Sequence, residues 1–221
     1  MPVLWFIRSQ KGYHRHNAKP TRNDSVCKMP TKRVFIPSMD QRFGYVYTIP
    51  AYERPNILHF NTRKQYYQLQ KIEPTGLSSH RKEILDHTLA VKIGRDINMH
   101  WKVDFGHGSS LNKSGRPPRH LGHAYHPHWA TITAALKALD IMKKICASHR
   151  HPTKIVFITE SEMLVNILGW GKNARHELSK GGFPHDMVSS YHEIEKSIHS
   201  IEKSGHRFVS FWCTPRTVHG R

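Results

Sequence analysis

A continuous apolar run, Ile155 to Thr159 (IVFIT), constrains the fold of this chain more than any other segment. Apolar runs without alternation are typical of strands buried on both faces, as in parallel sheets covered by helices. From Trp129 to Ala147, apolar residues recur at spacings of three and four, which predicts an amphipathic helix before the run. Ser161 follows as a candidate N-cap, which predicts another helix through Leu168. The chain is therefore expected to contain a helix–strand–helix unit.

The segments on either side of this unit extend the pattern. Downstream, apolar positions from Val188 to Ile201 predict a helix that ends at Gly205, and the sequence RFVSFW predicts a final strand. Upstream, the sequences LAVKIGR and MHWKVDFG predict two strands, the second running into a glycine- and serine-rich turn. Elements in this order imply an α/β fold with parallel strand pairs joined by crossovers.

The N-terminal part of the sequence is less regular. Short strand-like runs at 33–36, 43–48 and 56–60 are separated by prolines, and residues 65–87 show no periodicity that decides between helix and strand. We therefore divide the chain into a basic, partly ordered N-terminal extension, residues 1–88, and an α/β domain, residues 89–221.

The charge of the chain indicates the chemistry of its partner. Lysine and arginine number 34 against 16 aspartates and glutamates, a formal net charge of +18, so a polyanion, and nucleic acid above all, is the expected partner. No run approaches the roughly 18 apolar residues of a membrane-spanning helix, so we expect a soluble protein with no membrane contact.

The cysteines bear on the cellular compartment. Cys27, Cys146 and Cys213 are odd in number and lack CxxC spacing, so we expect reduced thiols in an intracellular protein. The first residues are basic, which fits an ordinary tail or a mitochondrial presequence. The nucleus, cytoplasm and mitochondrion all stay open, as does the oligomeric state.

Several motifs in the last 95 to 120 residues resemble the ribonuclease H family, in particular its fungal forms. WATITAALKALD resembles the family's helix motif, KIVFITESEMLVNIL its strand and following turn, and VSFWCTPR its last strand. The stretch with Trp170, Gly181, Gly182 and Pro184 resembles the segment before the family's last long helix. The resemblance implies a mixed sheet with flanking helices.

The resemblance also implies an activity: hydrolysis of the RNA strand of an RNA–DNA hybrid by two magnesium ions held on four carboxylates. This sequence departs from that set. Thr131 replaces the helix glutamate, Glu160 stands for an aspartate, and the first-strand aspartate corresponds to His107 or, in a shifted frame, to Asp104. The sequence stops at Arg221, before the position of the last carboxylate. We therefore expect weak or no activity, with magnesium as cofactor only if activity survives.

The surviving candidates have alternative interpretations. Glu160, Asp104 and His107 are the candidate catalytic residues, with Glu160 and Asp104 as metal ligands. Glu160 also suits a helix N-terminus through the helix dipole alone. Asp104 could instead be a polar residue on an outer strand face. A weakly active nuclease would use Glu160, Asp104 or His107 together with a carboxylate outside the motifs, such as Glu162 or Asp186.

Basic and aromatic residues supply the candidate nucleic-acid contacts. Asn112, Lys113, Arg116 and Arg119 follow the predicted first strand, where cations would neutralise phosphates; the alternative is a solvated loop. Trp170 and Trp212 are candidates for stacking on bases or for the core. The segment HLGHAYHPH holds His120, His123, His126 and His128, either a transition-metal site or a solvated loop.

Three functions fit these observations. The first is a nucleic-acid-binding, degenerate ribonuclease H-like protein, and the second is a weakly active hybrid nuclease. The third is a basic structural component of a ribonucleoprotein, held by the N-terminal tail.

Overall fold

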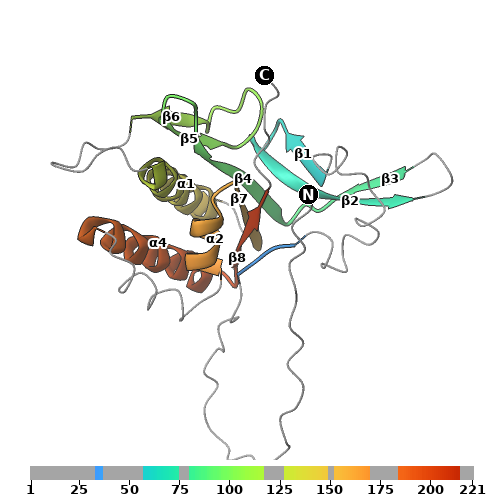
Figure 1. Cartoon of the computed structure of the whole chain (residues 1–221). Coiled ribbons are helices and arrows are strands. Elements are labelled where there is room, and N and C mark those ends of the chain that lie inside the picture. Colours follow the sequence, from blue (N-terminus) through green and yellow to red (C-terminus); the bar gives the residue numbers. More distant parts are fainter. Residues whose placement is uncertain are drawn as a thin grey trace, which may run out of the picture.

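A computed structural model describes residues 33–36, 57–74, 80–116, 127–148, 152–169 and 184–214 (Figure 1). These residues form a mixed α/β structure of eight strands in one sheet and three helices. In chain order the elements are β1 (Leu58–Asn61), β2 (Tyr66–Pro74), β3 (His80–Ile84), β4 (Thr88–Arg95), β5 (Trp101–Asp104), β6 (Lys113–Gly115), α1 (Pro127–Ser148), β7 (Lys154–Thr159), α2 (Glu162–Gly169), α4 (His185–Lys203) and β8 (Phe208–Cys213).

The centre of the sheet is β4. On one side it pairs with β5 in antiparallel fashion, and β5 pairs with β6 in the same way. On its other side β4 is parallel to β7, which is parallel to β8. The strands therefore lie in the order β6, β5, β4, β7, β8, and the predicted parallel pairs and mixed α/β class are confirmed.

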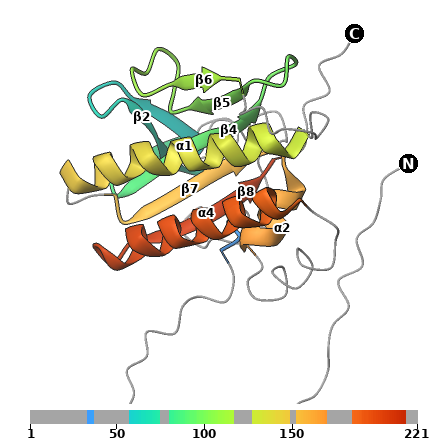
Figure 2. The same ribbon diagram turned by 90° about the vertical axis from the view of Figure 1, so that its left-hand side faces the viewer.

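All three helices cover one face of the sheet (Figure 2). The apolar stripe of α1 packs there with the odd-numbered residues of the central strands, such as Val91 and Phe157, which are fully buried. The helices expected from apolar spacing are confirmed as α1, α2 and α4. Ser161 is the expected cap of α2, since its hydroxyl accepts a hydrogen bond from the Leu164 amide at 3.2 Å.

The other face of the sheet carries a smaller apolar cluster, built from Ala90, Val156, Ile158 and neighbours. Residues 33–36 lie against this face and the edge of β8, where the amide of Phe35 donates to the Phe211 carbonyl at 2.8 Å. Arg33 binds both carboxylate oxygens of Glu202, at 3.2 and 2.9 Å. The strand expected at 33–36 is thus a short parallel bridge to β8.

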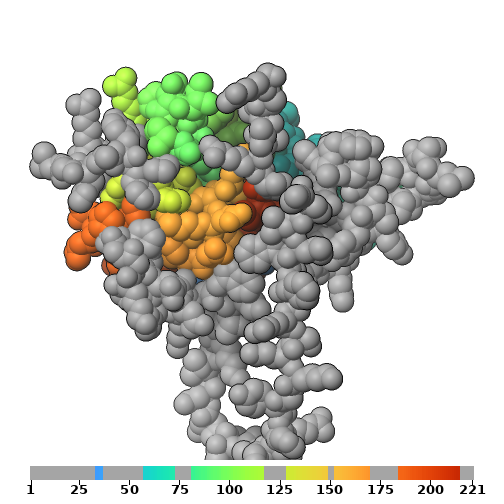
Figure 3. Space-filling model, in the orientation of Figure 1, coloured from blue at the N-terminus to red at the C-terminus, as the bar shows by residue number. Residues whose placement is uncertain are grey.

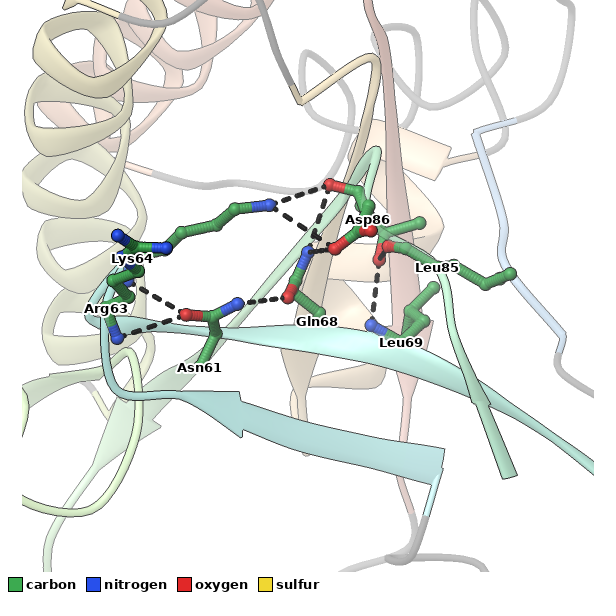
Figure 4. A network of polar contacts seen from close by, with 8 residues as sticks. Asn61, Arg63, Lys64, Gln68, Leu69, Leu85 and Asp86 are labelled. Atoms are coloured by element: carbon green, nitrogen blue, oxygen red, sulfur yellow. Dashed lines mark hydrogen bonds and ion pairs between the residues drawn. The ribbon is translucent and has the colours of Figure 1, made fainter. Parts of the chain in front are cut away.

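The β1–β2 hairpin is joined to the turn before β4 by a polar network (Figure 4). The Asn61 side chain donates to the Gln68 side chain at 2.7 Å, and Gln68 donates to the Asp86 carbonyl at 3.0 Å. Lys64 donates to the same carbonyl at 3.2 Å and lies 3.6 Å from the Asp86 carboxylate. These bonds fix the hairpin beside β4, with which β2 also pairs at Tyr67 and Ala90.

The structure adds to the expected order of strands at the N-terminal side. Residues 65–87, which sequence periodicity left open, hold β2 and β3, and β1 to β3 join the sheet from within the predicted extension. The run expected as a strand at 43–48 lies outside the described residues. Between the glycine-rich turn and α1 a further strand, β6, does form, although its three residues carry no apolar pattern.

Candidate functional site

The carboxyl ends of β4 and β7 meet at one edge of the sheet, because these strands are parallel. Ligands of open α/β sheets usually bind at such an edge. The chain leaves β4 at Arg95, β7 at Thr159 and β8 at Cys213. In Figure 3 the surface of the β4–β6 part of the sheet, in green, lies above that of α2, in orange. We refer to this part of the molecule as the carboxyl edge.

Glu160 lies at the carboxyl edge, in the turn between β7 and α2, with its side chain exposed. The turn is held by the Ser161 amide, which donates to the Thr159 hydroxyl at 3.1 Å. Burial raises the pKa of the neighbouring Cys213 thiol, and the charges of Glu162 and Glu160 raise it further. Glu160 therefore has the position predicted for it, next to a second carboxylate at the start of α2.

Two buried residues that face the helix-covered side, Ile93 and Thr131, carry no carboxylate. Ile93 is the last fully packed residue of β4 on that face, at 4% exposed, and it lies beside Thr159 in the register that pairs Lys92 with Ile158. Thr131, in the first turns of α1, is 6% exposed. An apolar side chain thus lies beside Thr159 at the end of β7, and α1 holds a buried hydroxyl at Thr131.

Asp104 lies elsewhere than predicted. It belongs to β5 and pairs with Lys92, so both side chains project from the face without helices. Since β4 lies between β5 and β7, the backbones of Asp104 and Ile158 are about 10 Å apart. The Asp104 carboxylate accepts a hydrogen bond from the Gly106 amide at 2.9 Å. The structure therefore does not bring Asp104 together with Glu160 or Thr131.

Neither Asp104 nor His107 lies on the central strand of the sheet. The central strand is β4, and residues 105–112 form a turn after the second strand, β5. His107 is exposed in this turn. Asn112, predicted to bind nucleic acid, holds the turn instead: its side chain accepts from the Phe105 amide and donates to the Gly106 carbonyl, both at 2.7 Å.

Basic residues gather near the carboxyl end of β4. In the register of the sheet, Arg95 pairs with Trp101, and Lys102 pairs with Gly94 and Ser114. The Trp101 indole donates to the Arg116 carbonyl at 3.1 Å. Lys102 and Arg116 are exposed, with Lys102 on the face without helices. Arg95 lies on the helix-covered face with Trp101, is half-buried, and donates to the Met99 sulfur at 2.6 Å. We call Arg95, Lys102 and Arg116 the basic rim.

Sequence reasoning identified only one member of the basic rim, Arg116. Lys113 is exposed on β6, at the far end of the pairing with β5, and Arg119 lies outside the described residues. Lys102 could have been found from the alternation in HWKVD, which places Trp101 and Val103 on one face and Lys102 on the other. Arg95 ends the predicted strand LAVKIGR, and its position beside Trp101 follows from the register of β4 with β5.

The remaining candidate residues lie either in the core or outside the described residues. Trp212 packs edge-on against Phe35, with ring centroids 6.0 Å apart, which favours the core interpretation. Trp170 and three of the four clustered histidines lie outside the described residues, whereas His128 is half-buried in α1. Cys146 and Cys213 carry free thiols.

No group of three or more histidine, cysteine, aspartate or glutamate side chains could hold a metal ion within the described part of the chain. None of the helices described is long and apolar enough to cross a membrane.

The structure, rather than a match to a known protein, defines the class of the chain. No protein-family description matches the chain, and no curated protein matches it in sequence. The described residues define a protein of mixed α/β class, with a helix-covered sheet and a basic rim at its carboxyl edge.

Proposed function

We propose that this chain is a nucleic-acid-binding protein with a ribonuclease H-like fold, in which hydrolysis of RNA–DNA hybrids is weak or lost. The strand order is the observation that supports the fold. Three antiparallel strands, β4 to β6, precede α1, and β7 and β8 then extend the sheet in parallel from β4. In this proposal, β4, β5 and β6 correspond to the family's first, second and third strands.

The basic rim supports binding of a polyanion. Lys102 and Arg116 are exposed near Trp101, and long cationic side chains neutralise phosphates without reading sequence. The chain as a whole has a net charge of +18, which strengthens the attraction at a distance. RNA and RNA–DNA hybrids are the polyanions that the fold favours.

The residues at the carboxyl edge do not fit a two-magnesium centre. Magnesium takes oxygen ligands, and two ions on one phosphate need dense negative charge around them. Glu160 is exposed, the buried residues Ile93 and Thr131 carry no carboxylate, and Asp104 lies on the face of the sheet without helices. We therefore propose binding as the function and derive no metal-dependent step.

A hybrid-cleavage assay tests this proposal. Full-length protein is incubated with a labelled RNA–DNA hybrid in magnesium, in manganese and in EDTA, and each sample is scored for cleavage and for gel retention. We expect retention in all three conditions without cleavage. Metal-dependent cleavage that disappears in Glu160→Ala would contradict the loss of activity and favour a weak nuclease.

The same assay distinguishes binding at the basic rim from the structural alternative, a ribonucleoprotein component. A ribonucleoprotein component held by its tail would lose retention on deletion of residues 1–32, whereas binding through the basic rim would persist. Those residues hold seven lysines and arginines against a single aspartate, which is why the tail is a competing source of affinity.

A further inference from the structure

The β4–β5 turn presents an unusual side chain at the carboxyl edge. Ile97 is 95% exposed, whereas the other exposed large apolar side chains of the described residues, Ile36 and Ile84, are 42% and 40% exposed. Ile97 therefore makes almost no contact with the fold. A tight turn favours small or polar residues, so folding gives no reason for an isoleucine here.

The turn that carries Ile97 is held firmly by its own residues. The Asp96 carboxylate accepts hydrogen bonds from the amides of Asn98 and His100, each at 2.8 Å, and lies 3.2 Å from the His100 ring. The Asp96 amide in turn donates to the His100 carbonyl at 3.0 Å. Met99 has a positive φ of 64°, which closes the turn. Ile97 is thus displayed on a preorganised support.

The surroundings of the turn are cationic and aromatic. Arg95 and Trp101, the last residue of β4 and the first of β5, pair at the base of the turn. Lys102 is the next residue of β5, and Arg116 lies beside the Trp101 indole. An exposed apolar side chain next to cationic residues suits a partner that has anionic groups on its surface and flat apolar groups in its interior.

We propose that Ile97 is an apolar wedge that contacts the face of an unstacked or terminal base when nucleic acid binds the basic rim. This inference rests on the proposed function and adds the contact that the rim cannot make. Proteins that deform nucleic acids insert aliphatic side chains between bases in this way. A rigid turn lowers the entropy lost on insertion, because the side chain is already in place.

Base fluorescence tests the wedge. The full chain is titrated into a hybrid that carries 2-aminopurine near one end, and retention of the same hybrid is measured in parallel. The wild-type protein is expected to raise the 2-aminopurine signal as the base unstacks. Ile97→Ser should abolish that rise and weaken binding roughly tenfold, whereas Ile97→Leu should preserve both.

Ile84→Ser is the matched control, since it removes an exposed isoleucine from β3, away from the rim. It should leave fluorescence and affinity unchanged, and thermal unfolding of the two Ile97 variants should match the wild type. Unchanged binding and fluorescence in Ile97→Ser would overturn the wedge while leaving the proposed function intact. No retention of the hybrid by the wild type would overturn both.

Two other partners of an apolar tip are outcomes of the same experiment. If Ile97→Ser leaves hybrid binding unchanged but abolishes binding to vesicles with anionic lipid, the tip is a membrane contact and the wedge is wrong. If the variant instead alters self-association in light scattering, with hybrid binding unchanged, the tip contacts a second copy of the chain.

Discussion

The two turns that flank β5 are built alike and exposed differently. In the β4–β5 turn an aspartate, Asp96, accepts two backbone amides, and in the turn at 105–112 an asparagine, Asn112, binds both an amide and a carbonyl. The second turn is also joined to the β1–β2 hairpin, because the Ser109 hydroxyl donates to the Gln65 carbonyl at 2.5 Å. The first turn projects from the sheet with Ile97 at its tip.

The comparison of the two turns distinguishes residues that the fold requires from residues that are available for binding. In the 105–112 turn, glycine, serine and asparagine are explained by backbone geometry and hydrogen bonds. In the β4–β5 turn, hydrogen bonds explain Asp96 but not Ile97. A glycine- and serine-rich sequence therefore indicated a site where the structure has a structural turn, and the better candidate lies at the opposite end of β5.

The largest expected effect is at Gly106. Its φ is 145°, and an added Cβ would lie 2.1 Å from the Phe60 ring. Gly106→Ala should destabilise the protein by roughly 3 kcal/mol, through backbone strain and overpacking, as measured by urea unfolding. Gly108→Ala is the control: φ is 73°, but nothing lies within 4 Å of the added methyl. Equal losses at the two glycines would contradict close packing of this turn against β1.

The next effect is at Asn112. Asn112→Ala removes both hydrogen bonds of its side chain and leaves the Phe105 amide without a partner, so we expect a loss of roughly 2 kcal/mol in the same unfolding assay. Asn98→Ala, in the exposed β4–β5 turn, should change stability little, because there the backbone amide makes the contact. A larger loss at Asn98 than at Asn112 would reverse the roles assigned to the two turns.

The smallest effect is a local response to pH in the β4–β5 turn. Desolvation acts to raise the pKa of Asp96, but hydrogen bonds from the His100 and Asn98 amides and the charge of His100 together lower the pKa below its usual 3.8. A carboxylate with a lowered pKa stabilises the folded turn at pH values above the pKa of the unfolded state. That contribution is lost as the pH falls through the pKa of the folded state.

Amide NMR signals of Asn98 and His100 should therefore move together in an acid titration, with a midpoint below 3.8. Asp96→Asn should remove this transition, while the amide of Leu111, which donates to the neutral Ser109 hydroxyl, should not share it. A midpoint at or above 3.8 would contradict the hydrogen-bonded turn.

Long apolar patterns made most of the fold predictable. Apolar spacing predicted α1 within two residues at its start and one at its end, and the uninterrupted apolar run predicted β7. Local hydrogen bonding predicted Ser161 as a cap. These features depend on neighbours in sequence, which is why a single sequence is enough to find them.

Features that depend on distant partners were not predictable. β6 has three residues and no apolar side chain, so pairing with β5 alone defines it. Residues 33–36 form their bridge because Arg33 meets Glu202, far along the chain. At the candidate site, Arg116 could be predicted because it is a basic residue that follows a predicted strand closely in the sequence. The position of Asp104 could not, because its face follows from the register with Lys92.

The salt dependence of hybrid binding tests the central claim most directly. Between roughly 50 and 200 mM salt, the logarithm of the binding constant should fall linearly with that of salt, and Lys102→Ala/Arg116→Ala should reduce the slope by about two. Lys144→Ala/Lys203→Ala, which removes two exposed cations near the ends of α1 and α4, should leave the slope unchanged. Equal slopes for both double variants, or binding that salt does not weaken, would contradict nucleic-acid binding at the basic rim.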